Sequence, residues 1–236
     1  MLRRSLQDST QPSLYRIEAK EQSRSNWVVF RQPQRGSGGH RQIRPRYAGI
    51  VCPSCERFDS DAVFNAGFDS DVSIHVRDDF AETSDYLFVI SQKVLDVLRR
   101  GRVRGYKVKK VGKAGWYAMQ ATLRVESYPR VFSYERTRCK ACGRPLDGGG
   151  LHELLAQIEP PAVSNTFFTT KLHCLAREGP DRDLFCTEDV ALLLKAHGIR
   201  KGSLHRLWTR EEKRTRDAKE KEDIFNWYPP KQIIWL

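Results

Sequence analysis

The sequence predicts an α+β fold, in which antiparallel strands combine with two strand–helix–strand units and an inserted, zinc-ribbon-like clasp of four cysteines. Three observations predict it. Two C-x₂-C pairs lie far apart in the chain. Short β-branched or apolar runs alternate with turn residues, and a strand followed by a capped amphipathic helix occurs twice. With 39% hydrophobic residues in a chain of 236, we expect one globular domain over residues 14–208.

The N-terminal part is expected to contribute short strands and loops. Residues 1–13 are basic but lack the apolar segment of a signal peptide, so we expect a disordered lead. Strand-like runs follow at Tyr15–Ile17 and Trp27–Phe30, before a turn-rich loop over residues 32–46. Residues 63–76 are predicted to form a loop and a short strand.

The first strand–helix–strand unit is predicted over about residues 84–125. Tyr86–Ile90 has the length and composition of a strand, and Ser91 is a candidate helix N-cap. Apolar residues then recur at helical spacing up to Gly101, where the helix is expected to end. The antiparallel strands and the turn predicted next are Tyr106–Val111, Gly112–Gly115 and Trp116–Val125.

The second unit is predicted over about residues 182–208 and repeats this order at an offset of 96 residues. Leu184–Cys186 is its strand, Thr187 its N-cap and Gly198 its helix stop. The pairs that coincide at this offset are Ser91/Thr187, Val94/Val190, Leu98/Leu194 and Val103/Ile199. We interpret them as an internal repeat. The alternative is chance, because a strand followed by a capped helix is common.

The C-terminal part changes abruptly in composition. Residues 209–223 are almost entirely charged and are expected to form a solvated helix or a linker. Residues 224–236 form an apolar tail, which we expect to pack against the core of the same chain.

The two cysteine pairs, Cys52/Cys55 and Cys139/Cys142, predict one structural Zn²⁺ per chain. Each C-x₂-C turn (a knuckle) points two sulfurs into one concavity, and tetrahedral zinc needs two such turns facing each other. Knuckles favour a residue with φ > 0 after the second cysteine, which Gly143 adopts without steric cost and Glu56 does not. The alternative is that one or both pairs are reduced, partly buried thiols or a redox pair.

Cysteine usage and charge limit the compartment and the partners. Free thiols and a metal suit a reducing compartment, so we expect a cytoplasmic protein, and Cys174 and Cys186 are expected to be small buried thiols. The net charge of +12 favours anionic partners. The candidate partner-binding residues are Arg99, Arg100, Arg102, Arg104, Lys107, Lys109 and Trp116. The alternative is that this basic run is a solvated helix end and edge strand.

No catalytic constellation is found. The sequence lacks the H-E-x-x-H, G-x-S-x-G and phosphate-loop patterns, and its six histidines are dispersed. A site closed by four thiolates also leaves no coordination position for a reactive water. We therefore expect no enzyme activity and no small-molecule substrate, and no apolar run is long enough to span a membrane.

The ordered motifs resemble those of the double-CXXCG motif proteins, which are paralogous in myxobacteria and regarded as immunity proteins of polymorphic toxin systems. The residues that carry the resemblance are Tyr15–Ile17, Tyr47–Cys55, Leu87–Ser91 with its helix, Cys139–Arg144 and Asp183–Val190. Glu56 stands where the family has glycine. The resemblance implies a cytoplasmic, non-enzymatic protein that neutralises a cognate toxin by binding it, and the +12 charge suits an acidic toxin surface.

A second hypothesis comes from another class, the zinc-ribbon nucleic-acid-binding proteins. In it, Arg99–Arg104 and Lys107–Lys110 contact phosphates, while Trp116 or Tyr117 stacks on a base. Salt discriminates between the two, because binding to phosphates weakens steeply as the salt concentration rises.

Overall fold

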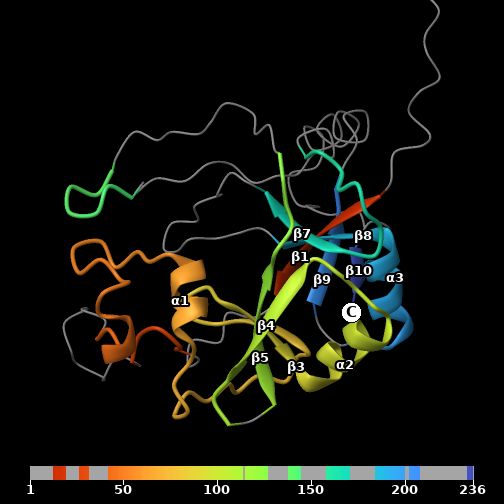
Figure 1. Cartoon of the computed structure of the whole chain (residues 1–236). Helices are drawn as coiled ribbons and strands as arrows, with labels where there is room; N and C mark the ends of the chain where they lie inside the picture. Colours follow the sequence, from red (N-terminus) through yellow and green to blue (C-terminus); the bar gives the residue numbers. More distant parts are fainter. Residues whose placement is uncertain are drawn as a thin grey trace, which may run out of the picture.

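The computed structural model describes residues 13–19, 27–31, 42–113, 115–126, 138–144, 158–170, 184–199, 202–207 and 233–235 (Figure 1). Within these ranges the chain is α+β, with two mostly antiparallel sheets and three α-helices, as the sequence predicts. Three parts named above lie outside the described residues: the expected lead except Ser13, Cys174, and the charged segment 209–223. In the described part of the chain, no helix has the length and apolar character needed to cross a bilayer.

The first sheet contains four antiparallel strands in the order β2-β3-β5-β4. Their bounds are β2 Phe80–Glu82, β3 Phe88–Ser91, β5 Trp116–Ala121 and β4 Tyr106–Val111. The strands β4 and β5 form the predicted hairpin, in which Gly112 and Gly115 supply positive φ values of 61° and 46°. The expected strand Trp116–Val125 is wrong as one element, because it ends at Ala121 and β6 (Arg124–Val125) joins the other sheet.

The second sheet contains six strands in the order β10-β9-β1-β8-β7-β6. Their bounds are β10 Ile233–Trp235, β9 Gly202–Arg206, β1 Leu14–Ala19, β8 Leu184–Thr187, β7 Phe167–Thr170 and β6 Arg124–Val125. All neighbours are antiparallel except β6 and β7. The strand β10 places the end of the predicted apolar tail beside β9.

Helices α2 (Gln92–Arg100) and α3 (Glu188–Ala196) each follow a strand directly. Ser91 caps α2 as predicted, since its hydroxyl accepts a hydrogen bond from the Val94 N–H at 3.3 Å. Thr187 occupies the N-cap position of α3, but the prediction that its side chain caps the helix is wrong. Its hydroxyl instead accepts from the Thr166 N–H at 3.2 Å, and so joins β8 to the segment before β7.

Both helices end in the same Schellman motif. After α2, the Arg102 N–H donates to Arg99 O and the Val103 N–H donates to Leu98 O. The equivalent bonds after α3 run from Gly198 to Lys195 and from Ile199 to Leu194. Arg102 (φ 50°) and Gly198 (φ 56°) hold the left-handed position.

The internal repeat includes more elements than the two strand–helix–strand units expected from the sequence. Strand β3, helix α2 and the start of β4 recur 96 residues later as β8, α3 and the start of β9. Strand β1 has the same length as β5 and the same pairing geometry: Tyr15 lies opposite Cys186 as Tyr117 lies opposite Ile90. Likewise, Phe167 pairs with Cys186 as Phe80 pairs with Ile90.

These correspondences divide the chain into two halves of the same plan. The first half, residues 14–111, contains β1, β2, β3, α2 and β4, and the second half, residues 116–207, contains β5, β7, β8, α3 and β9. The first strands are exchanged: β1 lies between β8 and β9, whereas β5 lies between β3 and β4. Each sheet therefore depends on a strand from the other half.

Three hydrophobic clusters follow this arrangement. The central cluster contains residues of both halves, including the equivalent pairs Phe80/Phe167 and Leu98/Leu194, and lies where α2 and α3 meet the sheets. Val89 and Val111 face the outer cluster of the first sheet, while their equivalents Phe185 and Leu207 face that of the second. In Figure 1, α2 and α3 lie side by side at one side of the molecule, with α1 on the opposite side of the first sheet.

Two predictions for the N-terminal region are wrong. Residues 60–66 form helix α1 (Ser60–Ala66), where the loop and short strand were expected to begin, because Asp59 accepts hydrogen bonds from the N–H groups of Asp61 and Ala62. Trp27–Phe30 is not a strand: only Phe30 forms an isolated bridge, to Ile43. Its backbone is held instead by the buried carboxylate of Asp85.

Candidate metal centre

The four cysteines predicted as zinc ligands converge on one point. The sulfurs of Cys52 and Cys139 are 3.8 Å apart, and those of Cys55 and Cys142 are 3.7 Å apart. All four Sγ atoms lie within 4.8 Å of one another. Zinc–thiolate bonds of about 2.3 Å in a tetrahedron require sulfur separations of about 3.8 Å. The four cysteines can therefore hold a tetrahedral metal ion, and all four are free thiols.

The two knuckles have the same backbone hydrogen bonds. In the first, the Glu56 N–H donates to Cys52 O at 2.8 Å, and the Cys52 N–H donates to Arg57 O at 2.9 Å. In the second, Gly143 and Arg144 take the equivalent positions around Cys139, at 2.8 Å in both bonds. The knuckles are 87 residues apart, the same offset that relates Phe80 to Phe167, so each half supplies one of them.

Glu56 adopts the backbone conformation expected of glycine. Its φ is 56°, close to the 69° of Gly143 at the equivalent position. A left-handed conformation costs a residue with a Cβ atom roughly 1 kcal/mol. The first knuckle thus closes without glycine, at a cost that the hydrogen bonds of the turn must offset.

Backbone N–H groups favour the thiolate form at one cysteine of each knuckle. The N–H of Cys55, with that of Ser54, lowers the pKa of Cys52 to about 6. The N–H groups of Cys142 and Ala141 lower the pKa of Cys139 in the same way. Burial instead raises the pKa of Cys55 to about 12, so this thiol must lose its proton when a metal binds.

One arginine joins the two knuckles, and another supports the second knuckle from within. Arg144 donates from its guanidinium to Arg57 O across the site at 3.1 Å, and Arg138 donates to Gly143 O at 3.0 Å. Cys52 and Cys139 are 5% and 6% exposed, and their partners are half-buried. Sequence reasoning missed these arginines, although an arginine lies two positions after the last cysteine of both knuckles.

The seven predicted partner-binding residues lie in three different surroundings. Arg99, Arg100, Arg102 and Arg104 are exposed, at and after the end of α2. Lys109 donates from Nζ to the carbonyls of Phe64 and Asn65, at 3.0 and 2.9 Å, and so caps the end of α1. Lys107 lies over the Phe64 ring at 4.7 Å, and Trp116 packs against the outer cluster of the first sheet.

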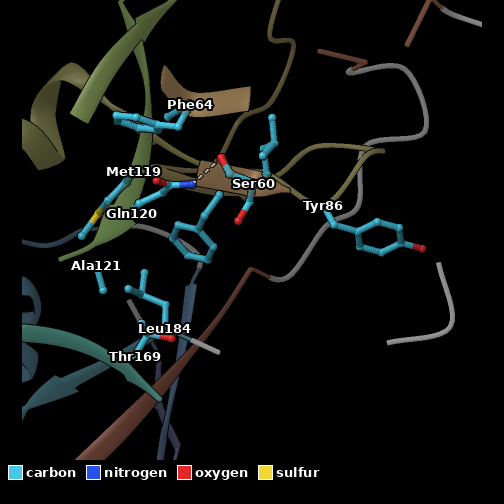
Figure 2. Close-up of a pocket in the computed structure, with 11 residues that line it drawn as sticks. Ser60, Phe64, Tyr86, Met119, Gln120, Ala121, Thr169 and Leu184 are labelled. Atoms are coloured by element: carbon cyan, nitrogen blue, oxygen red, sulfur yellow. Dashed lines mark hydrogen bonds between the residues drawn. The ribbon is translucent and has the colours of Figure 1, made fainter. Parts of the chain in front are cut away.

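A small cavity of about 50 Å³ lies between α1 and strands β3, β5, β7 and β8. Figure 2 shows Ser60 and Gln120 facing each other at its wall, where Gln120 Nε2 donates to Ser60 O at 2.8 Å. Within the described part of the chain, Ser60 Oγ and Gln120 Oε1 are buried without a hydrogen-bond partner. The space suits a few water molecules and is well below the volume of a typical ligand pocket.

Comparisons of this chain with protein-family models, with curated proteins and with solved structures find no match.

Proposed function

We propose that this chain is a zinc-clasped binding protein that neutralises a protein toxin, as the double-CXXCG proteins it resembles are regarded to do. One observation carries the proposal: the two knuckles, one from each half, share one backbone geometry and bring their four sulfurs within 4.8 Å. The positive φ of Glu56 supports the resemblance at the position where the sequence departs from it.

Zinc fits this site best among the common metals. Cys52, Cys55, Cys139 and Cys142 would hold one ion per chain, and four soft thiolates at tetrahedral spacing suit Zn²⁺ rather than calcium or magnesium. The bound ion supplies a covalent-like link between the halves. Because four protein ligands fill its coordination, the role is structural, and the protein acts by binding rather than by catalysis.

A reducing compartment agrees with this role. The five described cysteines are all free, and the site needs its ligands as thiolates. We therefore place the protein and its toxin in the cytoplasm. The exposed arginines after α2 and the +12 charge favour a toxin with an acidic contact surface.

A second candidate is binding to nucleic acid. The observation that favours it is the exposure of Arg99, Arg100, Arg102 and Arg104 within one short segment. Such a segment could contact consecutive phosphates, with an affinity that falls steeply between about 50 and 200 mM salt.

The deciding experiment is an affinity pull-down of the tagged, zinc-loaded protein from its native cells, with nuclease treatment and a high-salt wash. The immunity proposal expects one stoichiometric protein partner that is toxic when produced alone and harmless when produced with this chain. Recovery of nucleic acid before nuclease treatment, with no protein partner after it, would overturn the proposal in favour of the second candidate.

A further inference from the structure

The two halves differ at one sheet edge. In the second half, β9 is paired on both sides, by β1 and by β10. In the first half, the equivalent strand β4 is the last strand of its sheet. Among the described residues, no strand pairs with the outer edge of β4.

Backbone bonds identify which groups face this edge. The Thr122 N–H donates to Gly105 O at 2.8 Å, so the backbone carbonyl of Gly105 points toward β5. Because the direction of the backbone N–H and C=O groups alternates along a strand, these groups of Tyr106, Val108 and Lys110 point away from β5. Arg104 lies two residues before Tyr106, so its backbone groups should also point away from β5. They do: the Arg104 N–H donates to Asn165 O at 3.0 Å, and Arg104 O accepts from the Phe167 N–H at 2.9 Å.

Side-chain burial reflects the same difference. Leu204, opposite Ile234 of β10, is 0% exposed. Val108 is its equivalent, faces the same central cluster and remains only partly buried. Within the described part of the chain, β4 therefore lacks the neighbouring strand that β10 provides for β9.

Charge argues against a second copy of this chain as that strand. Antiparallel pairing of two β4 strands about Val108 would place Lys107 opposite Lys109 and Tyr106 opposite Lys110. Parallel pairing would place each lysine beside its own copy. Like charges across a strand pair are destabilising, and lysines on an edge strand prevent such self-association. A strand that carries a carboxylate beside the exposed Lys110 instead gains an opposite-charge pair.

We infer that the outer edge of β4 binds an extended, acidic segment of the protein partner, which adds to the first sheet as a further strand. Main-chain hydrogen bonds to Tyr106, Val108 and Lys110 provide the affinity, and aspartate or glutamate side chains beside Lys110 provide the selectivity. The inference rests on the proposed function, since it names the surface through which the partner is bound.

Amide hydrogen exchange in the full, zinc-loaded chain tests the edge without knowledge of the partner. In the free protein, the N–H groups of Tyr106, Val108 and Lys110 should exchange at least tenfold faster than those of Lys107 and Lys109. The probe is a short synthetic peptide in which glutamate alternates with valine, and it should slow the three outward N–H groups. Slow exchange of all three in the free protein would overturn the inference, as would no slowing at a saturating peptide concentration.

Variants at Lys110 separate main-chain from side-chain binding. Lys110→Pro removes the outward N–H, which an edge strand tolerates, and should weaken peptide binding at least tenfold. Lys110→Ala keeps the N–H and should weaken it about threefold. Lys110→Glu should weaken binding more than Lys113→Glu, the same charge change in the exposed turn beyond β4. Equal binding by Lys110→Pro and Lys110→Ala would overturn the inference.

The pull-down partner distinguishes this inference from the proposed function. If the partner binds wild type and Lys110→Pro equally, the edge is not its site, and the immunity proposal stands. If no protein partner is recovered but the peptide still protects the edge, the proposed function fails on its own.

Discussion

The first half of the chain and the second half reach the same backbone with different residues. Both have a knuckle, a strand that leads into a helix, and a Schellman motif. At the two left-handed positions, the second half has Gly143 and Gly198, whereas the first half has Glu56 and Arg102. Hydrogen bonding and packing therefore hold these turns even where the local residue disfavours them.

The halves also differ in what covers their sheets. The first sheet is covered by α1 and by the Trp27–Phe30 segment, and β4 is its last strand in the described part of the chain. The second sheet has a smaller outer cluster, and β10 covers its β9 edge. Among the described residues, the shared plan thus leaves β4 without the neighbouring strand that closes the equivalent edge at β9.

The largest expected effect comes from changes in the four-cysteine site, to which each half contributes one knuckle. Cys52→Ser and Cys139→Ser should each abolish zinc binding and lower the free energy of unfolding by about 5 kcal/mol or more, which is enough to unfold the chain. The two variants should be equally affected, because the cysteines are equivalent. Zinc content and thermal melting followed by circular dichroism measure both effects.

Cys186→Ala is the matched control, because Cys186 is buried in the central cluster and is not a ligand. It should keep one zinc per chain and lose about 1 kcal/mol. Retention of zinc and of the wild-type melting curve by either knuckle variant would show that the halves are not joined through the metal.

The next largest effect concerns the Trp27–Phe30 segment, which covers the first sheet. The Asp85 carboxylate accepts hydrogen bonds from the N–H groups of Val28, Val29 and Phe30, and from the Thr83 hydroxyl at 2.5 Å. Asp85→Ala removes the carboxylate that these three buried N–H groups share and should cost about 3 kcal/mol in urea unfolding. Asp71→Ala, which breaks an exposed ion pair with Arg44, should cost less than about 1 kcal/mol. Equal losses in the two would contradict this reading.

Exchanging the left-handed residues between the halves should give effects of opposite sign. Gly198→Ala should destabilise by about 1 kcal/mol through φ alone, since no atom lies within 4 Å of the added Cβ. Arg102→Gly and Glu56→Gly should each stabilise by about 0.5 kcal/mol, because relief of strain exceeds the added chain entropy. Urea titration of the three variants measures this. A loss of stability in Arg102→Gly would mean that its side chain stabilises the turn.

A further effect depends on pH. His205 of β9 stands where the first half has Lys109, and burial, with the nearby Arg16, lowers its pKa to about 4. The unfolded chain therefore binds more protons between pH 6.5 and 4, and stability should fall as the pH falls through this window. His205→Gln should lose less stability than wild type between pH 7 and about pH 5, as measured by urea unfolding. If the free energy of unfolding changed equally with pH in His205→Gln and wild type, the lowered pKa of His205 would be contradicted.

Much of this architecture is visible in the sequence where the signal is local. Ser91, Gly101 and Gly198 mark helix ends through capping chemistry, and the C-x₂-C spacing identifies the ligands. Helix α1 was missed, although Asp59 and Gly67 flank it, because a seven-residue helix has too few turns to show a period. Trp27–Phe30 has strand composition, yet a buried carboxylate from residue 85 takes its N–H groups.

The sequence alone predicts the α+β class, the four cysteines of the candidate metal site and the offset of 96 residues between the two strand–helix units. Those features follow from short-range capping, periodicity and turn chemistry. Three features became visible only in the folded chain: the exchange of β1 and β5, the glycine-like conformation of Glu56, and the place of β4 as the last described strand of its sheet. The physical reason is that strand partners and strained turns are settled by long-range hydrogen bonding and packing, for which residues near in sequence carry no signal.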